Sequence, residues 1–131
     1  MALDKNIVEL QLAKFGKFNK WLSRPECDCL HEVMETGEEI KALTSGYFES
    51  RNCLIAITNC RLLIVSGKRH SGFRQESLPL STIVAMSFSS GFRYGQFEFK
   101  TIAGEKKIDM LEKKDVALLA PLLTELLASF R

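Results

Sequence analysis

The stretch from Ile55 to Val65, IAITNCRLLIV, contains two apolar runs separated by a short polar segment. Thr58 and Asn59 open that segment. Both residue types favour tight turns, because their side chains hydrogen-bond the nearby backbone and Asn tolerates left-handed angles. Two apolar runs joined in this way indicate a β-hairpin between buried strands. This hairpin constrains the architecture of the chain more than any other segment, but it contains no catalytic group.

Length and composition indicate an ordinary globular protein. The chain has 131 residues, of which 46% are hydrophobic and 26% charged, and this length is enough to bury a core without disulfides or metals. The 18 basic and 16 acidic residues leave a net charge of +2, which argues against bulk attraction to nucleic acid. The sequence has no signal-peptide-type segment and no apolar run of membrane-spanning length. We therefore expect a cytoplasmic protein, with peripheral attachment to the inner face of the membrane as an open alternative.

The first third of the chain has helical character. Residues 3–22 place apolar side chains near the helical period, and Arg24-Pro25 ends this segment because a residue before proline avoids helical angles. A second short helix is expected over residues 26–34. We therefore divide the chain into an N-terminal helical extension, residues 1–33, and a domain formed by residues 34–131.

Seven strands are predicted after Gly37, because turn residues recur about every 8 to 12 positions. The alternation from Gln96 to Lys100 directs Phe97 and Phe99 to one face, and Ile108 and Met110 are expected to continue inward. The predicted strands cover residues 39–48, 53–58, 61–66, 73–78, 83–89, 95–102 and 106–110.

Residues 111–130 predict a helix that closes an open end of the sheets. Pro121 lies inside this segment, and proline costs about 3 kcal/mol in a helix interior. Two alternatives follow: a short turn precedes a helix that starts near Ala120, or a longer helix is kinked at Pro121. The apolar stripe consists of Val116, Leu119, Leu123, Leu126, Leu127 and Phe130.

Seven antiparallel strands followed by an amphipathic helix resemble a pleckstrin-homology-like (PH-like) barrel. From residue 34 to residue 131 the sequence is also similar to bacterial PH-like domains of the YokE type, which are related in pattern to GRAM domains. The resemblance implies an α+β fold, mainly β: a seven-stranded PH-like barrel or sandwich capped by a C-terminal helix. It rests on Glu38-Glu39-Ile40, Gly46, Ile57 to Ile64, Leu80-Ser81-Thr82-Ile83, Gly95 and Lys113-Lys114-Asp115.

Arg61, directly after the hairpin turn, has two interpretations. The structural one is that its guanidinium forks hydrogen bonds to carbonyls of the hairpin or of a neighbouring strand, which a Lys side chain does not reproduce. The functional one is that it binds an anionic ligand. We favour the structural interpretation for the motif formed by Thr58, Asn59 and Arg61.

Basic residues outside this motif suggest where a partner binds. The strongest cluster lies in the loop between the third and fourth strands, and such a loop suits contact with anionic headgroups or an acidic protein. A solvated hairpin tip is the simpler interpretation. The cluster consists of Lys68, Arg69, His70 and Arg74. Lys41 and Arg51 are weaker anion-site candidates, because Glu49 stands where phosphoinositide-binding PH domains place a second cation. Gly91-Phe92-Arg93-Tyr94 forms a second loop with exposed aromatic residues.

No catalytic, metal or cofactor site is predicted. The histidines lack an acidic neighbour of dyad type, and Cys27-x-Cys29-x-His31 has one-residue spacing where zinc knuckles use two. The four cysteines, Cys27, Cys29, Cys53 and Cys60, are expected to be free thiols in a reducing compartment. The charge run Glu35, Glu38, Glu39 is expected to be a solvated face.

These observations predict a non-catalytic PH-like binding module without metal or cofactor. Its partner is an unidentified protein or an anionic membrane surface, and not nucleic acid. The alternative is a structural or assembly protein that forms homo-oligomers through its N-terminal amphipathic helix, where Trp21 supplies apolar surface.

Overall fold

The computed structural model describes residues 7, 10, 30, 33–49, 51–68 and 72–129. Apart from single positions, the helices expected over residues 3–22 and 26–34 lie outside this set. Within the described part of the chain, no helix combines the length and apolarity needed to cross a membrane.

Seven strands and one long helix follow each other along the chain. The strands are β1 (Ile40–Phe48), β2 (Arg51–Thr58), β3 (Arg61–Lys68), β4 (Gly72–Pro79), β5 (Ile83–Ser90), β6 (Tyr94–Thr101) and β7 (Gly104–Glu112). A single turn of 3₁₀ helix, η1 (Leu80–Thr82), precedes β5, and helix α4 (Lys113–Ala128) follows β7. All seven predicted strands are confirmed, with ends that differ by at most two residues.

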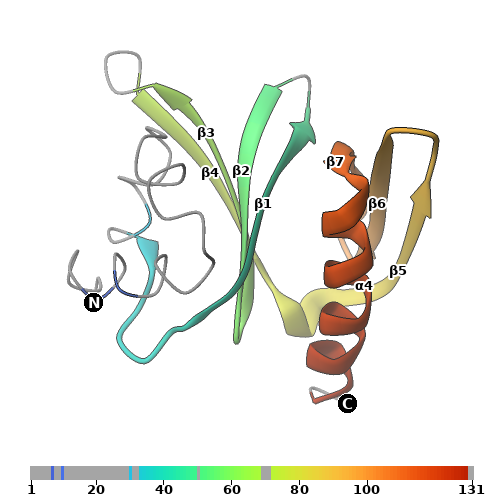
Figure 1. Ribbon diagram of the computed structural model, residues 1–131. Coiled ribbons are helices and arrows are strands. Elements are labelled where there is room, and N and C mark those ends of the chain that lie inside the picture. The colour runs from blue at the N-terminus through green and yellow to red at the C-terminus, as the bar shows by residue number, and fades with distance from the viewer. Residues whose placement is uncertain are drawn as a thin grey trace.

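The strands form one antiparallel sheet with the order β4-β3-β2-β1-β7-β6-β5. This order places β4 and β5, which are consecutive in the chain, at opposite edges of the sheet. The strands β1–β4 and β5–β7 form two halves that meet where Tyr47 of β1 lies opposite Asp109 of β7 (Figure 1). Helix α4 packs against β5, β6, β7 and η1, so it closes the side of the structure that the predicted terminal helix was expected to close.

The main core lies between the two halves of the sheet and α4. Phe97 and Phe99 are both buried, as their alternation predicted, and Phe97 stacks on Phe88 with ring centroids 4.5 Å apart. The buried residues of α4 are Val116, Leu119, Leu123 and Leu127. This stripe matches the prediction, apart from Leu126, which is only partly buried, and Phe130, which lies outside the described residues.

Both faces of β2 and β3 are buried. Ile55 and Ile64 belong to the main core, whereas Leu54 and Leu63, which alternate with them and point to the other face, are also fully buried. Leu30, ahead of β1, is fully buried as well. A strand that is buried on both faces needs a second covering layer, so the outer face of this half of the sheet contributes to the hydrophobic core.

Met110 contradicts the predicted inward alternation of β7. Ile108 is buried, but Met110 is 52% exposed and Leu111 is buried in its place. The reason is a β-bulge: the register of β6 and β7 shifts between Gly95 and Phe97, and Met110 adopts a left-handed φ of 58°. An extra residue in one strand reverses the facing of every residue after it.

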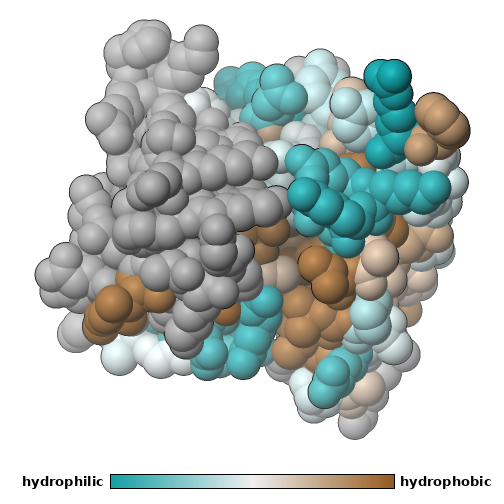
Figure 2. Space-filling model, viewed as in Figure 1, coloured by the Kyte–Doolittle hydropathy of each residue, from teal (hydrophilic) through white to brown (hydrophobic). Residues whose placement is uncertain are grey.

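Helix α4 starts at Lys113 and continues through Pro121 to Ala128. The turn that was predicted ahead of a helix starting near Ala120 is therefore absent from this described segment, and proline is accommodated inside the helix. Figure 2 shows hydrophobic surface alongside α4 and toward β1, and Leu118 of this helix is 70% exposed.

Candidate functional site

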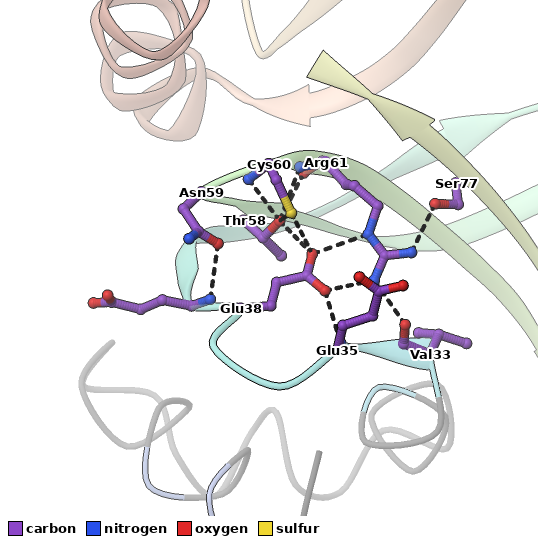
Figure 3. Close-up of polar contacts among 9 residues, drawn as sticks. Val33, Glu35, Glu38, Thr58, Asn59, Cys60, Arg61 and Ser77 are labelled. Atoms are coloured by element: carbon purple, nitrogen blue, oxygen red, sulfur yellow. Dashed lines mark hydrogen bonds and ion pairs between the residues drawn. The ribbon is translucent and has the colours of Figure 1, made fainter. Parts of the chain in front are cut away.

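A buried ion pair joins the segment before β1 to the start of β3. The Arg61 Nε donates to Glu38 Oε2 at 3.0 Å, and Nη2 of the same guanidinium donates to Glu38 Oε1 (Figure 3). Nη2 also donates to the Val33 carbonyl at 2.7 Å, and Nη1 donates to Ser77 Oγ of β4 at 3.0 Å. One guanidinium therefore connects three segments that are far apart in the sequence.

Thr58 and Asn59 complete this cluster from the hairpin turn. The Thr58 hydroxyl donates to Glu38 Oε2 and accepts hydrogen bonds from the backbone N–H groups of Cys60 and Arg61. Asn59 pairs with Glu39, because its N–H donates to the Glu39 carbonyl and its Oδ1 accepts from the Glu39 N–H. The turn thus holds both the carboxylate and the chain that leads into β1.

The prediction that Glu38 belongs to a solvated charge run is wrong, because its side chain is only 2% exposed. Burial alone raises the pKa of this carboxyl, but hydrogen bonds from Arg61, Thr58 and the Glu35 N–H outweigh burial and lower the pKa to about 2. The main partner of the guanidinium is this carboxylate, whereas the sequence predicted carbonyls of the hairpin or of a neighbouring strand. The guanidinium does bond one carbonyl, but Val33 precedes β1 and belongs to neither. The role of this arrangement is cross-linking, since the carboxylate already occupies the position of an anionic ligand.

A hollow of about 460 Å³, which we name the β2–β4 hollow, lies at the end of β2, β3 and β4 beside the β1–β2 turn. Its apolar floor continues the core face, and polar side chains replace apolar ones toward the strand ends. The register places Ser66 opposite Arg74 and Ile64 opposite Glu76. The lining residues are Phe48, Glu49, Arg51, Cys53, Ile64, Ser66, Arg74, Gln75 and Glu76.

Lys106 of β7 pairs with both carboxylates of the β2–β4 hollow. Its Nζ lies 3.5 Å from Glu49 Oε1 and 3.3 Å from Glu76 Oε1, and it stands 5.7 Å above the centre of the Phe48 ring. Burial lowers the pKa of Lys106, but the interactions with Glu76 and Glu49 outweigh it and raise the pKa. The ammonium group is therefore fully charged at neutral pH.

The two guanidinium groups of the β2–β4 hollow, unlike the ammonium group of Lys106, are not paired with a carboxylate of the described residues. Arg51 and Arg74 are exposed, and with the described residues neither forms a side-chain hydrogen bond or ion pair. Three cations, Lys106, Arg51 and Arg74, therefore face two carboxylates, and the hollow has an excess of one positive charge. A hydroxyl donor, Ser66, lies between the two guanidinium groups on the same face of the sheet.

The structure regroups the basic residues that the sequence singled out. Lys41 and Arg51 were paired as an anion site, but they lie at opposite ends of the β1–β2 hairpin, because Phe48 is the residue opposite Arg51. Seven residues of extended chain separate Lys41 from Phe48, or roughly 20 Å, and Lys41 lies 3.6 Å from Glu39. Arg51 instead shares its hollow with Arg74 of the predicted loop cluster.

The other members of that cluster are Lys68, Arg69 and His70. The backbone of Lys68 ends β3 opposite Gly72, and Arg69 and His70 lie outside the described residues. Arg74 itself belongs to β4 and not to a loop. Strand register, which the hydrophobic pattern did not reveal at the polar ends, would have been needed to group Arg51 with Arg74.

The described residues contain no cluster of three or more His, Cys, Asp or Glu that could hold a metal ion. Cys27, Cys29 and His31 lie outside the described residues, so their predicted lack of a metal stays a prediction. Of the described cysteines, Cys53 and Cys60, neither forms a disulfide. Burial raises the pKa of the Cys60 thiol, which keeps it protonated and weakly nucleophilic.

Comparison with known families decides the class of the domain. The family described as "Bacterial PH domain" matches residues 34–125, a span that contains all seven strands and most of α4. The chain belongs to this family. No curated protein matches the bacterial PH domain described here.

Solved structures confirm the fold of this bacterial PH domain at low sequence identity. A pleckstrin homology domain from Shewanella amazonensis SB2B is 13% identical, with a TM-score of 0.57 and coverage of 74% of this chain and 90% of that one. A DUF1696 family protein with a pleckstrin-homology domain from Shewanella loihica PV-4 is 16% identical, with a TM-score of 0.54 and coverage of 76% and 90%. The C-terminal domain of an unknown protein from Leishmania infantum is 17% identical, with a TM-score of 0.54 and coverage of 86% and 97%.

Proposed function

We propose that this bacterial PH domain is a non-catalytic binding module that receives an anionic group in the β2–β4 hollow. The observation that carries the proposal is the contrast between the two kinds of charge there. Both carboxylates, Glu49 and Glu76, are bound to Lys106, whereas Arg51 and Arg74 point to no partner among the described residues. PH-like folds generally serve as binding modules, and guanidinium groups bind phosphate and carboxylate with two parallel hydrogen bonds.

The geometry favours a ligand group of phosphate type. Arg51 and Arg74 approach from β2 and β4, the strands on either side of β3, and Ser66 of β3 offers a hydroxyl between them. The hollow, of about 460 Å³, is large enough to admit a phosphorylated headgroup. An anionic lipid headgroup and a free phosphate compound share this chemistry, so the experiment includes one arm for each.

The first arm measures co-sedimentation with vesicles of phosphatidylcholine that contain or lack phosphatidylglycerol. The second arm titrates inorganic phosphate into the protein in a calorimeter. We expect binding to the anionic vesicles, weakening as salt is added, and its loss in the double variant Arg51→Ala/Arg74→Ala. The matched control, Lys113→Ala/Lys114→Ala, removes the same charge from α4 and is expected to retain binding. Equal losses in both double variants would contradict a site in the hollow.

Within the family, we assign the chain to the YokE type on the motif from Thr58 to Leu62. We also propose attachment to the cytoplasmic face of a membrane as the setting in which an anion-binding hollow acts. If the protein binds phosphate in the calorimeter but does not bind vesicles, the ligand is a free phosphorylated compound and the membrane setting is wrong.

A further inference from the structure

A second hollow, of about 560 Å³, lies between β1, β5, β6 and β7 on the side of the sheet that faces away from the core. We name it the tyrosine hollow. Three large side chains line it and remain exposed: Tyr47 by 39%, Tyr94 by 48% and Met110 by 52%. They come from three different strands, so the fold gathers them on one surface.

Met110 reaches this surface because of the bulge in β7. A left-handed φ of 58° at a methionine is conformationally costly, and it turns the side chain from the core to the tyrosine hollow. Bulges commonly re-aim one side chain next to a binding surface. Methionine and tyrosine together form a soft, polarisable surface that suits an aromatic ring.

The loop between β5 and β6 forms the rim of the same hollow. Gly91 lines the hollow, and the next residue, Phe92, is 93% exposed. This loop projects at the upper right of Figure 1. An aromatic side chain with almost no intramolecular cover therefore stands directly beside a hollow that suits one.

Opposite charges accompany these two features. Arg93, next to Phe92, is exposed and forms no ion pair with the described residues. Asp109 lines the tyrosine hollow, and its side chain remains 39% exposed although the Lys107 Nζ lies 3.7 Å from Oδ1. One surface thus carries a projecting phenyl ring with a cation and, beside them, a hollow with an anion.

We propose that this surface binds a second copy of the chain about a two-fold axis. In each direction Phe92 of one copy enters the tyrosine hollow of the other, and Arg93 of the first copy pairs with Asp109 of the second. A two-fold interface requires a self-complementary surface, and the charge and shape complementarity within this single patch meets that requirement. The interface shares no residue with the β2–β4 hollow.

Charge reversal tests this pairing in the full-length protein by sedimentation equilibrium. The wild-type chain is expected to associate to twice its mass of 14.8 kDa. Each single variant, Arg93→Asp or Asp109→Arg, places like charges together twice per dimer and is expected to weaken association by about tenfold or more. Lys100→Asp reverses a charge on β6 outside the tyrosine hollow and is expected to associate like the wild type.

Mixing the two single variants gives the sharper test. In a heterodimer of Arg93→Asp with Asp109→Arg, both cross-copy contacts again join opposite charges, so an equimolar mixture is expected to recover association that neither variant shows alone. The variant Phe92→Ser, at an almost fully exposed position, is expected to be monomeric while its thermal unfolding is unchanged.

Three results would overturn the proposal. They are a wild-type protein that stays monomeric at every concentration, association that persists in Phe92→Ser, and a mixture of the two charge variants that remains as dissociated as its components. Persistent association in all loop variants would place the interface elsewhere, with the N-terminal helix as the next surface to test.

Discussion

Glu38 and Arg61 form a buried ion pair across 23 residues of sequence, and it anchors the entry into β1 to the β2–β3 hairpin. The pair is sustained by further hydrogen bonds to Thr58, Val33 and Ser77. The loss of one partner of a buried ion pair strongly destabilises a protein, because the other charge stays buried and unpaired. This dependence gives the first two predictions.

Replacement of Arg61 by lysine should lower the free energy of unfolding by about 1–3 kcal/mol. A single ammonium group cannot serve Glu38, Val33 and Ser77 at once. Urea unfolding of the two proteins measures the difference, with the exposed Arg93→Lys as the control that should leave the midpoint unchanged. An unaltered midpoint in Arg61→Lys would show that the forked geometry is dispensable.

Stability should fall in acid through the protonation of Glu38. Its pKa of about 2 in the folded protein lies below the ordinary value of 4.5, so its contribution is present above pH 4.5 and is lost as the pH falls toward 2. The loss should reach about 2–3 kcal/mol. Urea unfolding at a series of pH values checks this: Glu38→Gln should be less stable at neutral pH and should lose less stability between pH 4.5 and 2. Parallel pH profiles for both proteins would exclude Glu38 as the source.

Gly95 should tolerate no larger residue. A Cβ atom there would lie 2.5 Å from Val116 Cγ2 and 2.9 Å from the Ser89 carbonyl, so Gly95→Ala should destabilise the domain by about 1–3 kcal/mol. In the Gly95→Ala protein, the further change Val116→Ala should lower the stability by less than it does in the wild-type protein, because it removes the side-chain atom that clashes with the new Cβ. Gly91→Ala, whose Cβ would have 3.4 Å to its nearest neighbour, the Tyr94 carbonyl, is the control. Thermal unfolding compares all four variants, and strictly additive losses would refute the contact.

Removing one carboxylate from the β2–β4 hollow should strengthen anion binding. Glu76→Gln leaves Lys106 with Glu49 alone and adds positive charge to the hollow, so affinity for anionic vesicles should rise about two- to fivefold. Glu125→Gln, on α4, makes the same charge change away from the hollow. If both variants bind alike, the gain reflects net charge and not the position of Glu76.

Leu30 should be required for the stability of the whole domain, although it precedes the span matched by the family. It is fully buried, as are Leu54 and Leu63 on the outer face of β2 and β3. Leu30→Ala should therefore cost about 2–4 kcal/mol in chemical unfolding. Leu10→Ala, at a position that is 70% exposed, should cost almost nothing. An unchanged stability for Leu30→Ala would support an extension that folds separately from residues 34–131.

The hairpin, the seven strands and the terminal helix were predictable from the sequence because their signals are local. Turn chemistry at Thr58 and Asn59, alternation at Phe97 and Phe99, and a helical stripe from Val116 onward each depend on neighbours within a few residues. The class of domain followed from the order of these elements.

The tertiary structure alone decided which charged residues meet. Glu38 looked like part of a solvated acidic run, because its partner Arg61 is distant in sequence, and burial together with that partner determines its charge state. Arg51 separated from Lys41 and joined Arg74 through strand register, and one bulge turned Met110 outward. Periodicity fixes the facing of a residue only while the register is unbroken. Contacts between strand ends depend on how the sheet folds back on itself, which no local pattern encodes.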